Sequence, residues 1–478
     1  MFKNKTYQLV LLGVAGLMLH GCGIPDLAVK KPDSQLPDSF KPALTQKTNT
    51  AKIQWKTFFD DPNLLSLIDT AVANNKEVNI MLQRISVAQN EIQARRGEYL
   101  PFVNFGAGAG GDKTADFTRN GAVEDNLNIK PGQAFPTFLG DYQFGLISTW
   151  EVDIWKKLRN ATKVAMLEYM ASIEGKNFLV TNLVAEVAHS YYELVALDNQ
   201  LENLEQNIAI QKNGLEVVKE LQMYARSTTL AVKRYDAEVT KNQSKRYEIK
   251  QQITEAENRI NFLLGRTPQP IKRTSAGFMD IKLKMVDAGI PSQLLQNRPD
   301  IRQAELEMSA ADLNIQVARA NFYPSFAIKA GVGFDAFDLK YLINTPESLA
   351  AMVAGELVAP VVNKNAIIAK YKNANAQQIQ AAFEYEQSIV KAYAEVANQL
   401  ANIDNLGNNY QLKKKQVDYL VQSIDISNQL FKSARADYLD ILLTQRDALD
   451  AKKELIETKQ KQIIAMVDLY KSLGGGWQ

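Results

Sequence analysis

The sequence contains one passage twice, and this self-similarity constrains the fold more than any other feature. Residues 94–110 read ARRGEYLPFVNFGAGAG, and residues 318–334 read ARANFYPSFAIKAGVGF. In both, a charged helical pattern reaches a tyrosine and a proline, Pro101 or Pro324, and then enters an alternating run of apolar and small residues. The repeat predicts that the chain folds as two copies of one structural unit.

The first copy opens with a helical pattern whose seam is typical of supercoiled helices. Mostly apolar residues recur at alternating spacings of four and three from Leu64 to Ile92. This is a 3.5-residue repeat, which indicates a coiled coil rather than a globular core helix. The seam includes Asn75 and Gln89, and polar side chains in a seam fix its register at some cost in stability.

A second seam predicts a helix of unusual length. It runs from Leu194 to Val218 and includes Gln211. Residues 155–222 contain no proline, and a helix of that extent would be about 100 Å long. The helical pattern then resumes and stops at the sequence LLGRTPQP, at Gly265. We therefore expect long antiparallel coiled-coil helices in each half.

The second half follows the same order. We expect the first structural repeat at 55–265 and the second at 290–478, separated by a connector at 266–289. Each repeat consists of a helix, a β-hairpin and two long helices. The predicted hairpins cover about 102–152 and about 325–359.

The alternating stretches allow two interpretations. In SFAIKAGVGF, Phe326, Ile328 and Val332 lie on one strand face, and Lys329 and the glycines lie on the other. A half-buried strand of a soluble sandwich has this signature, and so does a transmembrane β-strand. The chain offers about four such strands, whereas membrane barrels begin at eight. Since open edges do not survive in lipid, a barrel here requires other copies of the chain.

The N-terminal residues, MFKNKTYQLVLLGVAGLMLHGC, have the layout of a secretory signal. The sequence LHGC resembles a bacterial lipobox, in which a small residue precedes a cysteine that becomes the acylated N-terminus. We expect residues 1–21 to form a lipoprotein signal peptide, Cys22 to carry a covalent lipid, and residues 22–54 to form an extended segment. A buried structural cysteine is the alternative for Cys22, which is the only cysteine in the chain.

Composition argues against several classes of function. The chain has 55 Lys and Arg against 53 Asp and Glu, so it lacks the basic field that nucleic-acid binding requires. Once residues 1–21 are removed, His189 is the one histidine left, which excludes zinc ligand sets and Cys/His nucleophiles. The glycine run LGGGW lacks the Lys and Ser/Thr of a nucleotide loop. We expect no enzyme, no metal and no cofactor other than the lipid.

Several passages together resemble one family. They are the LHGC start, WEVDIWKKLRNA (150–161), LLQNRPDIRQAE (294–305), ARANFYPSF (318–326) and LYKSLGGGW (469–477). In order and spacing they resemble TolC-type outer membrane factors, specifically the NodT/OprM-like lipoprotein branch that serves tripartite efflux systems. The resemblance covers nearly the whole mature chain.

The resemblance implies both architecture and function. The expected fold is an α+β membrane protein: a homotrimer whose 12-stranded transmembrane β-barrel, four strands per chain, continues into a long antiparallel α-helical coiled-coil barrel. It implies a passive exit duct in the outer membrane of a Gram-negative bacterium, anchored by lipid, in contact with outer membrane lipids and extending into the periplasm. The implied partners are a periplasmic adaptor protein and an inner-membrane pump of the RND type. The alternative is a lipid-anchored periplasmic coiled-coil scaffold without a barrel.

The resemblance also places a pore gate at residues 431–449. Asp440 matches the first of two pore-facing acidic positions, and Leu439 matches a constricting leucine of the lipoprotein branch. Leu443 stands where the second acid would be. Lys233 and Ala436 replace the acid and the arginine of the family's polar latch. A ring of Asp440 carboxylates would concentrate cations, while the alternative is that Asp440 solvates a helix surface.

Overall fold

The computed structural model describes residues 24–40, 53–282, 287–433 and 435–477, which fall into two compact units. Cys22 lies outside the described residues. The sheet unit comprises the described chain up to Lys31, Ser86–Tyr169 and Leu306–Ala382. The helical unit comprises the described parts of Pro32–Ile85, Met170–Glu305 and the chain from Phe383 onward.

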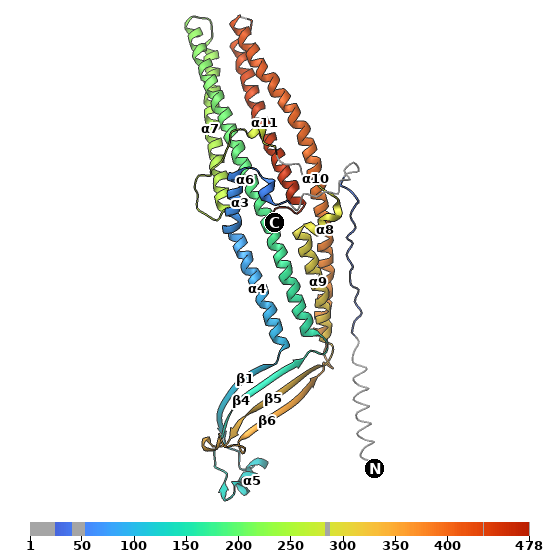
Figure 1. The fold of residues 1–478 in the computed structure, drawn as a ribbon. Coiled ribbons are helices and arrows are strands. Elements are labelled where there is room, and N and C mark those ends of the chain that lie inside the picture. Colours follow the sequence, from blue (N-terminus) through green and yellow to red (C-terminus); the bar gives the residue numbers. More distant parts are fainter. Residues whose placement is uncertain (1–23, 41–52, 283–286, 434, 478) are drawn as a thin grey trace. The chain divides into compact units, whose positions relative to one another are not determined.

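Four antiparallel strands form the main sheet of the sheet unit, in the order β1, β4, β5, β6 (Figure 1). They are β1 (Phe102–Asp112), β4 (Leu139–Val152), β5 (Ser325–Ala336) and β6 (Leu349–Val358). Between β1 and β4 lie α5 (Arg119–Asn126), β2 (Asn128–Lys130) and β3 (Gln133–Ala134). Among the described residues β1 pairs with β4 alone and β6 with β5 alone, so both outer strands have one edge without a partner strand.

The register of this sheet gives it one apolar and one polar face. Phe105 lies opposite Leu146, which in turn lies opposite Val332. On the same face the rings of Phe144 and Phe334 stack with centroids 5.3 Å apart. The residues between them point to the other face and include Asn104, Gln143, Thr149, Glu151, Lys329 and Glu356. The apolar face is not covered by the chain itself, since the side chain of Phe105 is 69% exposed.

Two pairs of long helices follow the strands (Figure 1). They are α6 (Lys157–Met223) with α7 (Thr229–Leu263), and α10 (Asn365–Lys432) with α11 (Tyr438–Ser472). The other α-helices of the described residues are α2 (Trp55–Phe58), α3 (Pro62–Asn74), α4 (Lys76–Tyr99), α8 (Leu294–Asn297) and α9 (Pro299–Ala320). The order helix, two strands of the main sheet, two long helices thus occurs twice, from α4 to α7 and from α9 to α11.

Asn75 interrupts the first predicted seam instead of lying within it. It separates α3 from α4, and its carboxamide Oδ1 accepts hydrogen bonds from the backbone N–H groups of Glu77 and Val78, at 2.9 and 3.1 Å. Its Nδ2 donates to the carbonyl of Leu263 at the end of α7, 2.8 Å away. The polar side chain therefore caps one helix and ties it to the end of another.

The core of the helical unit lies where the short helices α2 and α3 meet α6 and the end of α11. The ring of Tyr470 stacks on Phe58 with centroids 4.2 Å apart, and Phe59 meets Phe58 edge-on. Leu64, Ile68 and Leu194 are fully buried. Burial raises the pKa of the Tyr470 hydroxyl well above its usual range.

Candidate functional site

The proposed gate residues lie at the start of α11, directly after the turn that joins it to α10. Asp437 precedes the helix, and its backbone N–H donates to Oδ2 of Asp440, 3.0 Å away. A carboxylate in the first turn is also favoured by the helix dipole. Asp440 remains exposed while its carboxylate stabilises the helix start.

Leu439, Asp440 and Leu443 share one face of α11. Their spacing of one, three and four residues places them within about 100° of one another around the helix. Leu439 and Leu443 are half-buried and Asp440 is exposed. The opposite face carries the buried residues Ile441, Leu442, Gln445, Ala448 and Leu449. The structure therefore brings the three sequence-predicted residues together, on the side of α11 that its own chain leaves most open.

An apolar cluster, which the sequence reasoning missed, lies behind the gate residues. Leu442 packs with Leu215 and Val218 of α6 and with Tyr235 of α7, and Tyr438 packs against the same cluster. The ring centroids of Tyr235 and Tyr438 are 6.3 Å apart. The signal was present as a seam in α11, because residues 438, 442, 445 and 449 have alternating spacings of four and three.

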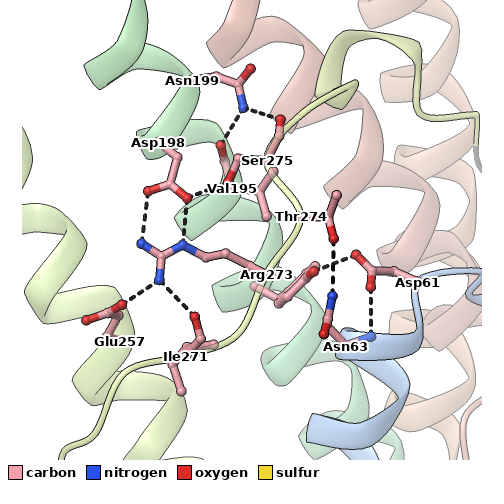
Figure 2. Close-up of polar contacts among 11 residues, drawn as sticks. Asp61, Asn63, Val195, Asp198, Asn199, Glu257, Ile271, Arg273, Thr274 and Ser275 are labelled. Atoms are coloured by element: carbon pink, nitrogen blue, oxygen red, sulfur yellow. Dashed lines mark hydrogen bonds and ion pairs between the residues drawn. The ribbon is translucent and has the colours of Figure 1, made fainter. Parts of the chain in front are cut away.

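The connector between the halves is fastened to α6 and α7 by Arg273 (Figure 2). Its guanidinium donates from Nε to Oδ2 of Asp198, at 2.6 Å, and from Nη2 to Oδ1, at 3.0 Å. It also pairs with Glu257 of α7. The hydrogen bond to Asp198 is the main reason that the pKa of Arg273 is raised. A two-pronged Arg–carboxylate contact fixes orientation as well as distance.

The same connector reaches the other helical pair a few residues later. Lys459 of α11 donates from Nζ to the carbonyl of Ile281, 2.7 Å away. Met279 packs against a cluster that includes Val417 of α10 and Leu455 of α11. Burial lowers the pKa of Lys459. The connector therefore bridges the two pairs of helices within the helical unit.

The passage LLQNRPDIRQAE contains a deeply buried, ion-paired arginine. Arg298 is 4% exposed and donates to Oδ2 of Asp300 and to Oε2 of Glu395, each at 2.7 Å. It also donates to the carbonyl of Ser472, 2.9 Å away. Burial alone would lower the pKa of Arg298, but its hydrogen bonds to Asp300 and Glu395 raise the pKa above the usual value. Arg298 thus joins the start of α9 to α10 and to the end of α11.

Two further passages meet at the helix–strand junction of the sheet unit. The ring of Trp155 stacks on Tyr323 with centroids 4.6 Å apart, and its indole N–H donates to the carbonyl of Pro324, 2.7 Å away. The carboxylate of Asp153 accepts from the backbone N–H of Leu158 at 3.0 Å and so caps the start of α6. The tyrosine–proline boundary of the second half, at Tyr323 and Pro324, is therefore one of the places at which the two halves contact each other.

Within the described ranges, no group of three or more His, Cys, Asp or Glu side chains is arranged to hold a metal ion. None of the helices in the described part of the chain combines the length and the hydropathy needed to cross a bilayer.

A four-stranded antiparallel sheet joined twice to pairs of very long helices defines a class of protein, the TolC-like outer membrane channels. A crystal structure of a membrane protein from Pseudomonas aeruginosa has this fold: its TM-score is 0.85 at 24% identity, over 95% of this chain and 100% of that chain. The chain belongs to the outer membrane efflux protein family, whose model matches residues 67–266 and 290–475.

Two relatives illustrate the family. The solvent efflux pump outer membrane protein SrpC of Pseudomonas putida is 28% identical over 435 residues, which are 90% of this chain and 88% of SrpC. The cation efflux system protein CusC of Escherichia coli is 26% identical over 470 residues, 97% of each chain. The predicted family and its function as an outer membrane efflux channel are confirmed, and the family is one of channels rather than of enzymes.

Proposed function

We propose that three copies of the chain form one closed 12-stranded barrel in the outer membrane, continuous with a coiled-coil tunnel. The observation that carries the proposal is the pair of free edges on β1 and β6, in a sheet whose apolar face the chain leaves exposed. A lone sheet of this kind would expose unpaired N–H and C=O groups to lipid. Closing three sheets edge to edge pairs these groups, with the apolar face outward and the polar face lining the lumen.

The proposed lipid anchor and the proposed division of the chain into repeats are inferred from the sequence. Removal of residues 1–21 leaves a lipid on Cys22, and the lipid aids targeting because a single anchor is weak compared with an embedded barrel. The two halves are an internal duplication, with the extended segment at 22–54, repeats at 55–265 and 290–478, and the connector at 266–289.

The proposed channel ends in a gate at the start of α11. Three symmetry-related copies of Leu439, Asp440 and Leu443 narrow the lumen and present a ring of carboxylates that favours cations. Asp440 is exposed on the helix face opposite the apolar cluster, which supports this placement. The gate opens on docking to a periplasmic adaptor, and an RND-type inner-membrane pump drives export.

Native mass spectrometry of the detergent-extracted protein tests the assembly. The proposal predicts a trimer that carries one lipid modification per chain and releases monomers only under denaturing conditions. A monomer that becomes fully soluble when Cys22 is changed to Ser would contradict the barrel and support the scaffold alternative, because a true barrel still needs detergent without its lipid.

A further inference from the structure

Helix α11 packs against α6 and α7 through two apolar layers. One layer lies nearer the turns that join α6 to α7 and α10 to α11, and it contains Leu442 with Leu215, Val218 and Tyr235. The layer farther from the turns contains Leu449 with Leu204 and Ile208 of α6, and Ile249 of α7 packs against it. Apolar layers of this kind hold helices together without any directional preference.

A polar layer separates the two apolar layers. On α6, Gln211 is three residues after Ile208; on α11, Gln445 is three residues after Leu442. On α7, Asn242 is seven residues from Tyr235 and from Ile249. Spacings of three and seven residues are those of a heptad pattern, and they keep each of the three side chains on the packed face of its helix. All are buried: Gln211 and Asn242 are 0% exposed and Gln445 is 6% exposed.

The hydrogen bonds of this polar layer are incomplete. Asn242 donates from Nδ2 to Oε1 of Gln211, 2.8 Å away. Three other buried atoms in the layer have no hydrogen-bond partner among the described residues: Nε2 of Gln211, Oδ1 of Asn242 and Oε1 of Gln445. A buried amide group without a partner loses its hydration without compensation. The layer therefore disfavours the packed arrangement relative to an apolar layer of the same shape.

We propose that the polar layer formed by Gln211, Asn242 and Gln445 is the site at which α11 separates from α6 and α7 when the channel opens. The proposal rests on the channel function and names the element that moves. Separation lets water reach the three amides, which lowers the cost of breaking the two apolar layers. One donor and two acceptors are also the set that a single entering water molecule can satisfy.

The edge of the layer gives water a path. Lys245 of α7 lies 3.8 Å from Asp450 of α11, with side chains that are 37% and 50% exposed. An exposed ion pair at this distance contributes little to holding helices together. Lys245 and Asp450 line a cavity together with Leu449 of the neighbouring apolar layer. A small displacement of α11 therefore admits solvent from that side.

Replacing an amide of the layer by an apolar side chain of similar shape tests the proposal. In Gln445→Met the side chain keeps its length and loses its demand for a partner. We expect the open fraction of the purified channel in a planar bilayer to fall about tenfold, the effect of relieving one uncompensated amide. Gln416→Met, at an exposed position of α10, is the matched control and should leave the open fraction unchanged.

A second variant and a second readout keep the test independent of conduction. Leu442→Gln puts an amide into the neighbouring apolar layer and should raise the open fraction. Hydrogen exchange of the α11 backbone should slow in Gln445→Met and accelerate in Leu442→Gln, relative to Gln416→Met. Exchange rates and open fractions that do not differ between Gln445→Met and the control would overturn the proposal. Absence of current from both the unmodified protein and Leu442→Gln would instead contradict the channel function, and exchange would still decide the role of the layer.

Discussion

Replacing Arg298 by Met should destabilise the helical unit more than any loss of a surface ion pair. Arg298 is 4% exposed and holds together Asp300, Glu395 and the carbonyl of Ser472. Methionine can fill part of the space left by the aliphatic stem, so the main loss is that of the charged donor. The change removes one partner from each of three contacts at once.

The exposure of each partner sets the magnitude. Removing one member of a fully buried pair costs about 3–5 kcal/mol. The side chain of Glu395 is 39% exposed and regains water, so its share is less than about 1 kcal/mol. Asp300 is 19% exposed, and Ser472 is 5% exposed and loses a charged donor. We expect a total of about 3 kcal/mol, or unfolding about 100-fold faster if these contacts are lost at the barrier.

Unfolding rates in denaturant, followed by circular dichroism of the detergent-purified protein, measure this effect. Lys391→Met is the matched control, because Lys391 also pairs with Glu395, but at 4.0 Å and with a side chain that is 69% exposed. Its expected effect is below about 0.5 kcal/mol. Arg298→Lys should fall between the two, since lysine keeps the charge but loses the fork. Equal unfolding rates for Arg298→Met and Lys391→Met would show that the buried contacts of Arg298 stabilise the helical unit no more than a surface ion pair does.

Three further predictions concern Gly265, Tyr235 and Cys22. Gly265 has a φ of +68°, and an added Cβ would lie 2.5 Å from the carbonyl oxygen of Asn74, so Gly265→Ala should cost more than about 1 kcal/mol. Gly97→Ala in the last turn of α4, where an added Cβ meets nothing within 4 Å, should stabilise by about 0.5–1 kcal/mol. Thermal unfolding of the two variants tests the difference. Burial raises the pKa of Tyr235 to about 12, above its unfolded value of about 10, so its contribution is complete below pH 10 and is lost as pH rises through 12. The unfolding rate of the unchanged protein should therefore rise from pH 9 to 12, and this rise should be smaller in Tyr235→Phe. An equal rise in both proteins would assign the loss of stability to other titrating groups. Cys22→Ser should lower the yield of trimer more than it alters the conductance of the trimers that form, and an unchanged yield in quantitative gels would contradict the role of the lipid in assembly.

Regular patterns in the sequence account well for the long elements. The absence of proline from residues 155–222 and a sustained seam correspond to α6, which runs Lys157–Met223. A period of two residues likewise describes the apolar face that carries Phe326 and Val332. In such elements the same spacing of apolar residues recurs many times, so one polar residue out of pattern hardly changes the prediction.

Features that depend on distant partners were not visible in the sequence. Asn75 satisfies the 3.5-residue seam, yet it ends α3 because its carboxamide bonds to the carbonyl of Leu263, far along the chain. Arg273 is one basic residue among many until the fold places Asp198 and Glu257 beside it. The proposed gate could be predicted from the sequence only in part. Helical spacing puts Asp440 on an open face of α11, but a position on a pore axis would depend on other copies of the chain.

Planar-bilayer conductance of the detergent-purified trimer, native against Asp440→Ala, tests whether three copies of this chain form a cation-selective channel. We predict discrete, cation-selective currents from the native trimer and a loss of cation selectivity when three carboxylates are removed from the lumen. Trimers that are intact by native mass spectrometry but conduct no ions, either as the native protein or as Leu442→Gln, would contradict a channel formed by three copies of this chain.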